Sequence, residues 1–381
     1  MKLKILHTNF HRGWGGQAAR VFYLCRQLVK MGYDVTVAAP QGSVLTEKCQ
    51  AAGVPTLETV RFSKGFRPMD FINDVKTLRR FMVTHGTEIL HTHGSQDTWS
   101  GCTAASLCRK RPLVVRTRHN TFPVKYTLVN RMLHRRWIDW LVVVSDSVVE
   151  RYSRFIEAGI VKADRITTIH SSLQVERFDP DVMDGQTARD ELGLSKDTPV
   201  LVVSARLASE KGHKFLLDAM PTILKAHPDA VLILAGEGNQ ESALREQVTR
   251  LGIEGNVRFL GFRSDVPSII ASADVCVLPS IDCDASSAAI KEAMAMRKPV
   301  VATRIGGAPE IIDDGVTGVI VPPADSDALA MTISRLLADP QQRLEVGNAA
   351  REEVIEHYTE ARLAEETAKV YEAVIEAGPR R

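Results

Sequence analysis

Two carboxylates stand eight positions apart at a strand-to-helix junction in residues 278–303. Asp284 lies in a loop rich in Ser, Asp and Ala, and Glu292 lies in the helix that is predicted to follow. The N–H groups at a helix N-terminus favour anions, so the amides of Ser286 and Ser287 suit a diphosphate. Carboxylates would repel phosphate and suit hydroxyls instead. The segment is therefore typical of a sugar-nucleotide site, and capping of the helix by the same acidic residues is an equal alternative.

Two cations stand five positions apart in the loop after another apolar strand, residues 201–204. Arg206 and Lys211 precede Gly212 and a predicted helix, at the strand end where α/β proteins bind ligands. The Arg206 guanidinium can bind phosphate through two hydrogen bonds, and the Lys211 ammonium binds it as a point charge. The loop therefore predicts a diphosphate contact, with a solvated basic loop as the alternative.

A glycine pair, Gly15 and Gly16, follows the first predicted strand and precedes a helical pattern. Glycine lets the backbone approach a ligand closely, and the helix start suits an anion. A tight strand-to-helix connection would also need glycine, so this motif by itself indicates a ligand contact only weakly.

Polar residues follow two predicted strands in the first half of the chain. His93 and Asp97 follow one strand, and Arg118 and His119 follow the next. We expect their side chains at the ligand-binding edge of a sheet. A structural role is the alternative for any single histidine.

The elements that position these groups are short apolar strands alternating with helical patterns. Strands are predicted at residues 3–8, 34–39, 88–92, 113–117, 141–144 and 165–169, and again at 200–204, 230–235, 257–260, 275–278, 300–303 and 318–321. This alternation is typical of an α/β fold with doubly wound parallel sheets. Two sets of strands predict two Rossmann-like domains, residues 1–180 and 181–365, facing a central cleft.

Bulk properties indicate a globular enzyme. The 381 residues are 44% hydrophobic and 25% charged, which is ordinary for a soluble protein. No apolar run approaches the roughly 20 residues that span a bilayer. The apolar stretch at the N-terminus is too short for a signal peptide. We therefore expect a cytoplasmic protein. Its six cysteines lack CxxC spacing, which predicts reduced thiols and no metal cluster.

Charge is divided unequally along the chain. Residues 1–180 carry 27 Lys and Arg against 14 Asp and Glu, whereas residues 181–381 carry 21 against 32. A basic half favours an anionic partner such as a phosphorylated acceptor, nucleic acid or an acidic membrane surface. Residues 126–137 combine arginines with apolar residues at helical spacing, so this segment could lie on an anionic membrane or pack as an ordinary core helix.

Taken in order, these motifs resemble the retaining family-4 glycosyltransferases of the GT-B fold. That family carries a Glu, a glycine-rich stretch and a second Glu eight positions after the first. Here Asp284 takes the first position and Glu292 the second, while Ala285, Ser286 and Ser287 replace the glycine-rich stretch. The resemblance implies that Asp284 holds hydroxyls of the donor sugar and Glu292 those of the ribose. The amides of Ser286 and Ser287 would meet the phosphates.

The resemblance also implies roles for the other motifs. Arg206 and Lys211 would neutralise the leaving diphosphate, which explains how such enzymes dispense with a metal ion. Gly15 and Gly16 would reach the donor phosphates and the acceptor. His119 matches the position of a functional histidine of the family, and we expect it to position the acceptor, with His93, Asp97 and Arg118 as further candidates.

Two strand-end loops would receive the nucleotide base in the same family, largely through backbone contacts. One contains Gly236 and Glu237, and the other contains Phe259 and Leu260. In the GT-B architecture the last helix commonly returns to the N-terminal domain, which predicts that role for residues 366–381. Residues 1–180 would then bind the acceptor and residues 181–365 the donor.

The expected activity is retaining, metal-independent transfer of a sugar from a nucleotide diphosphate sugar to a hydroxyl, with Arg206, Lys211, His119 and Asp284 as the catalytic set. The acceptor would be a glycan, a glycolipid or a phosphorylated molecule, as in lipopolysaccharide or other cell-envelope synthesis, handled peripherally at the inner membrane face. Two alternatives are a sugar-nucleotide epimerase or phosphorylase of the same fold, and a non-catalytic sugar-nucleotide-binding scaffold. Nucleic-acid binding is not expected, because no recognition module is evident.

Overall fold

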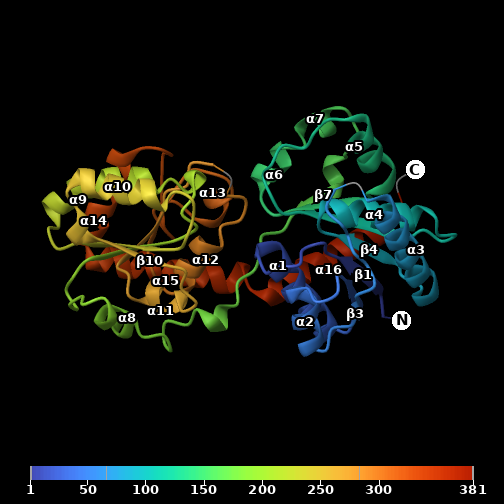
Figure 1. Ribbon diagram of the computed structural model, residues 1–381, viewed down its shortest axis with the longest axis horizontal. Coiled ribbons are helices and arrows are strands. Elements are labelled where there is room, and N and C mark those ends of the chain that lie inside the picture. Colours follow the sequence, from blue (N-terminus) through green and yellow to red (C-terminus); the bar gives the residue numbers. More distant parts are fainter. Residues whose placement is uncertain (1, 66, 283, 380–381) are drawn as a thin grey trace. The chain divides into compact units, whose positions relative to one another are not determined.

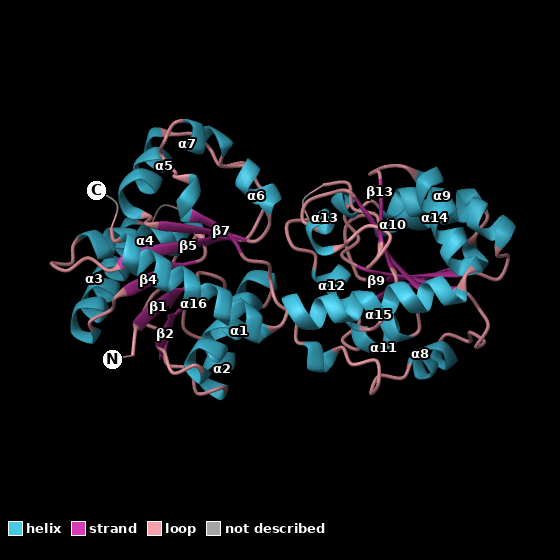
Figure 2. Cartoon of the chain, turned by 180° about the vertical axis from the view of Figure 1, so that it is seen from behind, coloured by secondary structure: helices cyan, strands magenta, loops and turns pink. Residues whose placement is uncertain are grey.

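The computed structural model describes residues 2–65, 67–282 and 284–379. Contacts divide the chain into two compact units, which we call unit 1 (Met1–Ser172 with Glu360–Arg381) and unit 2 (Leu173–Thr359). Each unit is a parallel sheet with helices packed on it (Figures 1 and 2). The predicted α/β class with two doubly wound sheets is confirmed.

Unit 1 contains a seven-stranded sheet in the order β3-β2-β1-β4-β5-β6-β7. Its strands are β1 (Lys4–Thr8), β2 (Asp34–Ala38), β3 (Thr56–Leu57), β4 (Ile89–Thr92), β5 (Leu113–Arg118), β6 (Trp140–Val143) and β7 (Ile166–Thr168). Strand order reverses between β1 and β4, where His7 pairs in register with His91. Ligands of doubly wound sheets bind at the carboxyl ends of the strands beside such a switch point.

Helices connect and cover the strands of unit 1. They are α1 (Gly16–Lys30), α2 (Val44–Ala51), α3 (Pro68–His85), α4 (Ser95–Ser106), α5 (Leu128–Met132), a π-helical turn η1 (Leu133–Trp137), α6 (Asp146–Glu150), α7 (Ser153–Glu157) and the C-terminal α16 (Glu360–Ala377). Figures 1 and 2 both show α16 beside α1. Leu363, Tyr371 and Val374 of α16 share one buried cluster with Ile5 of β1 and Val21 of α1, so the last helix is part of the unit 1 core.

Unit 2 contains a six-stranded sheet in the order β10-β9-β8-β11-β12-β13. Its strands are β8 (Val200–Ser204), β9 (Val231–Ala235), β10 (Val257–Gly261), β11 (Val275–Leu278), β12 (Val300–Thr303) and β13 (Val319–Val321). Its helices are α8 (Gly185–Glu191), α9 (His213–Ala226), α10 (Glu241–Leu251), α11 (Val266–Ala271), α12 (Ala288–Ala295), α13 (Ala308–Ile311), α14 (Ser326–Ala338) and α15 (Pro340–His357). The switch point lies between β8 and β11, which carry the two candidate donor loops at their carboxyl ends.

The unit boundaries differ from the predicted ones at both crossings. The first lies between Ser172 and Leu173 rather than between residues 180 and 181, because Leu173 and Phe178 are buried in the unit 2 core. The second lies between Thr359 and Glu360, so residues 360–365, expected in the donor domain, begin helix α16 of unit 1. The two-residue strand β3 was not predicted, because no apolar run marks it.

Two further expectations concern membrane spans and thiols. Across the described ranges, no helix is long and apolar enough to cross a membrane. Five of the six cysteines are described, and each is free and buried: Cys25, Cys49, Cys102, Cys108 and Cys276. Cys283 lies outside the described residues.

Candidate functional site

A largely buried ion pair joins the two candidate donor loops of unit 2. Lys211 Nζ lies 2.9 Å from Asp284 Oδ2, although the residues are 73 positions apart. Their side chains are 19% and 9% exposed. The hydroxyl of Ser280 donates to the same carboxylate oxygen at 3.3 Å. The switch point therefore brings together a cation and a carboxylate that the sequence placed only in separate motifs.

The backbone around Lys211 is fixed by close packing against the second loop. Gly212 has φ +67°, and a Cβ there would lie 1.9 Å from the carbonyl oxygen of Pro279. Only glycine fits both this conformation and this contact. The amide of Ile281 donates to the carbonyl of Glu210 at 2.9 Å. The two loops thus hold one another in place and set the direction of the Lys211 side chain.

Arg206 stands apart from this pair. Its side chain is 67% exposed and forms an ion pair with Glu210. The pKa of Glu210 is held below its usual value, because the Glu210 carboxylate accepts a hydrogen bond from the Glu210 backbone N–H and lies beside the positive charge of Arg206. The expected convergence of Arg206 and Lys211 on one anion is not present in the structure, because each cation has a carboxylate partner of its own. A phosphate at Arg206 would have to compete with Glu210.

A third loop, after β12, was missed by the sequence analysis. Gly307 N donates to the Asp284 carbonyl oxygen at 2.9 Å, and a Cβ on Gly306, at φ +58°, would lie 1.9 Å from that oxygen. Thr303 donates a hydrogen bond to the Ser280 carbonyl. A glycine pair three positions after the end of a strand was the available signal. This loop fixes the backbone of Asp284.

The two serines predicted to offer amides also act through their side chains. Ser287 caps α12, accepting from the amide of Ile290 at 3.4 Å. Ser286 accepts from the ammonium of Lys291 at 2.9 Å, and Lys291 is only 1% exposed. Capping, proposed for the acidic residues, is carried out by Ser287 instead. Lys291 adds a positive charge beside this helix start, where the sequence offered no signal for it.

Glu292 lies on the same helix and is half-buried. Burial raises its pKa, and the positive charges of Arg177 and Lys291 act in the opposite direction. Removal from water makes a carboxylate a stronger partner for hydroxyl donors. The position is consistent with contact to sugar hydroxyls.

Of the two loops expected to receive a base, the one with Gly236 and Glu237 follows β9, whereas Phe259 and Leu260 lie within strand β10 itself. Gly236 has φ +153°, and a Cβ there would lie 2.1 Å from the carbonyl oxygen of Ala205. The exposed Glu237 accepts from the amide of Phe262 at 3.4 Å. Phe259 and Leu260 instead pack their side chains against the buried clusters of unit 2.

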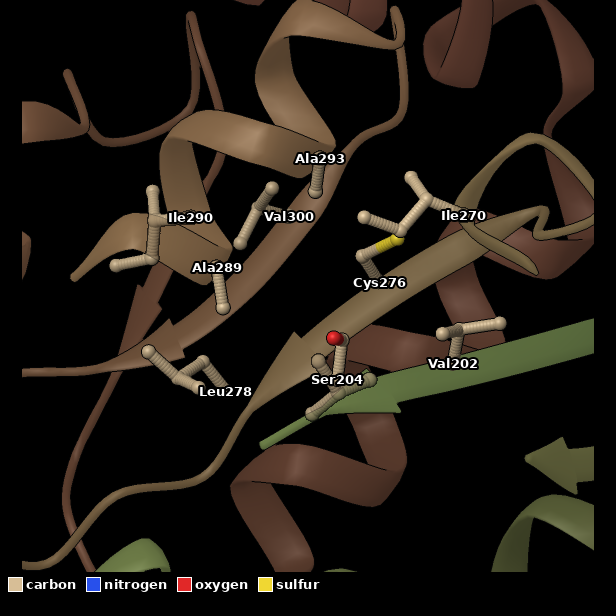
Figure 3. Close-up of a pocket in the computed structure, with 10 residues that line it drawn as sticks. Val202, Ser204, Ile270, Cys276, Leu278, Ala289, Ile290, Ala293 and Val300 are labelled. Atoms are coloured by element: carbon tan, nitrogen blue, oxygen red, sulfur yellow. The ribbon is translucent and has the colours of Figure 1, made fainter. Parts of the chain in front are cut away.

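A small cavity lies behind α12, among β8, β11 and β12. Its volume is about 10 Å³, which is room for a single water. Figure 3 shows the Ser204 hydroxyl among apolar side chains that include Leu278, Ile290 and Val300. The cavity is too small for a nucleotide, so it belongs to the packing that supports α12.

In unit 1 the glycine pair lies at the start of α1. Gly15 has extended backbone angles, φ −173° and ψ 176°. Apart from their chain neighbours, no described atom lies within 4 Å of where a Cβ of Gly15 or Gly16 would stand. The fold of unit 1 therefore does not require glycine here, which favours the ligand-contact interpretation.

Asp97 has a structural role that burial explains. It is 0% exposed, and Oδ2 accepts from Thr8 Oγ1 at 2.7 Å and from the amides of His93 and Gly94 at 3.0 and 3.1 Å. Burial raises its pKa, and these hydrogen bonds oppose the change. The predicted acceptor contact does not fit this geometry, because Asp97 caps α4 and presents no surface.

His93 is also buried, whereas His119 and Arg118 are partly exposed. His93 Nδ1 lies 3.1 Å from His119 Nε2. Arg118 donates to the carbonyl of Phe122 at 2.8 Å, and burial lowers the pKa of its guanidinium. Of the acceptor candidates, His119 and Arg118 retain surface for a ligand. His93 can act only through His119.

The arginine-rich segment of unit 1, residues 126–137, is divided: helix α5 lines a groove, whereas Leu133 after it is buried in the core. Leu128 is 77% exposed and Val129 is 55% exposed. The groove has a volume of about 840 Å³, and its lining includes Leu128, Arg131, Met132, Arg135, Arg136 and Trp137. The alternative of an ordinary core-packed helix is therefore wrong for α5.

Comparison with known proteins covers nearly the whole chain. Residues 14–177 match the family model described as Glycosyltransferase Family 4, and residues 184–353 match the model described as Glycosyl transferases group 1. The chain is 29% identical over 356 residues to EpsD of Bacillus subtilis, covering 91% of each protein.

A second relative is the GDP-mannose-dependent monoacylated alpha-(1-6)-phosphatidylinositol monomannoside mannosyltransferase of Corynebacterium glutamicum. It is 33% identical over 226 residues, which is 57% of this chain and 58% of that protein. The chain thus matches little more than half of this relative. Among solved structures, Anabaena Alr3699/HepE in complex with UDP has a TM-score of 0.82 and 22% identity, with 97% of this chain and 100% of that chain covered. This likeness shows the fold.

Proposed function

Since the chain belongs to the family-4 glycosyltransferases and has their GT-B fold, we propose that it transfers a sugar from a nucleotide diphosphate sugar to a hydroxyl of a glycan or glycolipid, with retention of anomeric configuration. The observation that carries the proposal is the largely buried pair of Lys211 and Asp284 at the switch point of unit 2. A carboxylate suits sugar hydroxyls, and an ammonium suits the phosphate to which the sugar is attached.

In the proposed reaction the bond between the anomeric carbon and the phosphate oxygen breaks, and the nucleoside diphosphate leaves with the electron pair. The acceptor oxygen forms the new bond on the same face, and its proton passes to a leaving phosphate oxygen. Lys211 stabilises the negative charge that develops on the phosphate, and Arg206 does so after release from Glu210. Asp284 holds the sugar in orientation.

We further propose that no metal ion is needed. A divalent cation would serve to neutralise the diphosphate, and Lys211, Arg206 and the buried Lys291 supply positive charge near the same loops. Activity should therefore persist in excess EDTA. Loss of activity in EDTA, restored by added magnesium or manganese, would contradict this part of the proposal.

The base of the donor nucleotide is proposed from the relatives. The mannosyltransferase relative is named for GDP-mannose, and the HepE structure contains UDP, so both bases are candidates. Thermal-shift measurements with UDP-, GDP- and ADP-sugars would choose among them, because a ligand that binds the folded state stabilises it by mass action. The proposal expects one base to stabilise the protein well beyond the others.

The acceptor is proposed to be a glycolipid or another phosphorylated molecule, as in cell-envelope or lipopolysaccharide synthesis. The support is the groove beside α5, where the exposed side chains of Leu128 and Met132 adjoin Arg135 and Arg136. Apolar side chains among arginines suit the surface of an anionic membrane. The named acceptor of the mannosyltransferase relative is also a phosphoinositide glycolipid.

Flotation with anionic and neutral liposomes tests the membrane contact. Wild-type protein should float with anionic vesicles, and the double variant R135E/R136E should not. Full activity on a soluble neutral acceptor, with no binding to either kind of vesicle, would contradict the glycolipid proposal and leave the transferase proposal intact.

The transfer itself is tested by measuring release of nucleoside diphosphate with and without acceptor. The proposal expects release to depend on acceptor and Lys211→Ala to abolish it. Epimerised donor in the absence of acceptor would favour an epimerase, and phosphate-dependent release would favour a phosphorylase. Tight donor binding without any turnover would favour a binding scaffold.

A further inference from the structure

A chain of buried hydrogen bonds begins on β5 of unit 1. Thr117 Oγ1 lies 2.7 Å from His91 Nε2, and His91 Nδ1 lies 2.7 Å from the hydroxyl of Tyr371. The same hydroxyl lies 3.1 Å from His7 Nε2. All four side chains are at most 1% exposed. Tyr371, on the C-terminal helix, thereby connects a histidine of β4 to a histidine of β1.

The chain continues through two more histidines to the edge of the sheet. His7 Nδ1 lies 3.0 Å from His93 Nε2, and His93 Nδ1 lies 3.1 Å from His119 Nε2. The rings of His7 and His93 are nearly parallel, at 15°, with centroids 5.3 Å apart, so the bonded nitrogens lie between the ring centres. We call Thr117, His91, Tyr371, His7, His93 and His119 together the histidine chain. His119 Nδ1 makes no hydrogen bond to any described residue, so it is the outer end.

The rings of the chain are neutral. Burial lowers the pKa of His7 to about 3 and holds the pKa values of His91, His93 and His119 well below 6.5. The positive charge of the buried Arg20 on α1 acts in the same direction on the last three. Each ring therefore carries one N–H. The hydroxyl of Tyr371 is buried and must also donate to a ring nitrogen, so the hydrogens along the chain all point the same way.

Thr117 decides that direction. Its hydroxyl is buried, and among the described residues His91 Nε2 is its only hydrogen-bond partner. If Thr117 donates, every ring accepts at Nε2 and donates from Nδ1, and His119 carries its hydrogen on Nδ1. If all bonds reverse, the Thr117 hydrogen is left without a partner. A buried unpaired hydroxyl is costly enough to favour the first direction by roughly 5- to 160-fold.

A metal ion is the competing interpretation, because nitrogens of His7, His91 and His93 lie within 4.8 Å of one another. Metal-bound imidazole offers its lone pair to the ion, with Zn–N distances of about 2.0–2.1 Å. Here both nitrogens of each of these rings already lie within hydrogen-bond distance of a partner. The hydrogen-bonded chain therefore accounts for all three rings.

We propose that the histidine chain holds His119 as the Nδ1–H tautomer, so that His119 donates a hydrogen bond to a hydroxyl oxygen of a bound sugar. Thr117 and Tyr371 are then positioning residues that act through His119. The sugar as the ligand rests on the proposed function. The tautomer does not, because it follows from contacts within unit 1.

The tautomer is measured directly by long-range ¹H–¹⁵N correlation on wild-type protein with ¹⁵N-labelled histidine, with the His119 signals assigned by their loss in His119→Gln. Nδ1 of His119 should have the shift of a protonated ring nitrogen and Nε2 that of a bare one. The opposite pattern overturns the proposal. Neither result depends on any glycosyltransferase activity, so failure of the two proposals is distinguishable.

Two variants at one buried position show whether the chain sets the tautomer. Thr117→Val keeps the shape of the side chain and removes the hydroxyl, so both tautomers of His119 should be populated to a similar extent. Thr117→Ser keeps the hydroxyl and should preserve the wild-type pattern. Tyr371→Phe interrupts the chain and should act like Thr117→Val. An unchanged tautomer in Thr117→Val and Tyr371→Phe overturns the proposal.

Kinetics and metal analysis complete the test. Thr117→Val should lower kcat/KM for the acceptor by about two-fold, because about half of the molecules carry the incompetent tautomer, and Thr117→Ser should restore it. Stoichiometric zinc or another transition metal in purified wild-type protein, lost in His91→Ala, would overturn the proposal in favour of a metal site.

Discussion

The two units place opposite chemistry at equivalent points of similar sheets. At the switch point of unit 2, between β8 and β11, an ammonium and a carboxylate meet as the ion pair Lys211–Asp284. At the switch point of unit 1, between β1 and β4, His7 and His91 are neutral and hydrogen-bonded. Unit 2 therefore presents charged side chains at its switch point, whereas unit 1 presents neutral rings that are oriented by hydrogen bonds.

The largest expected difference between the units is in their stability in acid, where unit 1 should unfold before unit 2. The pKa values of His7, His91 and His93 are lowered by burial, so below pH 6.5 the unfolded chain binds more protons than the folded one and stability falls as the pH falls. Each histidine costs about 1.4 kcal/mol at pH 5.5, roughly 4 kcal/mol for the three. The raised pKa of Asp97 offsets part of this loss.

The sequence provides a probe for unit 1 alone, because all four tryptophans lie in it: Trp14, Trp99, Trp137 and Trp140. Urea unfolding at pH 7.5 and 5.5 should therefore show a larger shift of the midpoint by tryptophan fluorescence than by circular dichroism, which reports both units. In unit 2, burial lowers the pKa of one histidine, His213, to about 4. Unit 2 should therefore lose less stability than unit 1, where three histidines are affected. Equal shifts by both probes would contradict the assignment of neutral histidines to unit 1.

Removing the cation of the unit 2 pair should have the next largest effect. Lys211→Ala leaves Asp284 buried without its partner and removes a charge from the proposed diphosphate site, so kcat/KM should fall by about 10²–10³. Lys214→Ala, an exposed lysine three positions away, is the matched control and should retain activity. Steady-state kinetics on both variants decides this, and similar activities would remove Lys211 from the mechanism.

The support of Asp284 by the third loop can be tested by a single methyl group. Gly306→Ala would place Cβ 1.9 Å from the Asp284 carbonyl oxygen at a positive φ, which should cost about 2 kcal/mol of unfolding free energy and weaken donor binding. Gly255→Ala is the control in the same unit, because nothing lies within 4 Å of its Cβ position. Equal unfolding free energies of the two variants in urea would show that the loop can move to accommodate the added methyl group, and would contradict this support of Asp284.

Among the unit 2 variants, the smallest effect is expected at Arg206. Its side chain is mostly exposed and paired with Glu210, so Arg206→Ala should lower kcat/KM by only about ten-fold, or roughly 1.4 kcal/mol. Glu210→Gln frees the guanidinium and should tighten donor binding. If Arg206→Ala is as damaging as Lys211→Ala, the exposed cation contributes as much as the buried one, and burial is not what distinguishes them.

The sequence predicted twelve of the strands within about two residues, because runs such as Val275–Leu278 are short, apolar and buried on both faces. It missed β3, where Thr56 and Leu57 pair with β2 without any apolar run. It placed the first boundary eight residues late, because Leu173 and Phe178 are single apolar residues in a polar stretch whose burial depends on the tertiary structure.

The site was predictable only as separate loops. Lys211 and Asp284 were both identified, but their contact depends on the pairing of β8 with β11. The histidine chain was harder still: His93 and His119 were identified, but Tyr371 is 280 positions from His91. Its contact depends on the return of α16 to unit 1.

Isothermal titration with the nucleoside diphosphate of the stabilising donor tests the central claim most directly. Wild-type protein and Lys214→Ala should bind it with the same affinity, and Lys211→Ala should bind it at least ten-fold more weakly, because the ammonium meets the phosphate. Equal affinity for wild-type protein and Lys211→Ala would contradict the placement of the donor at the Lys211–Asp284 pair.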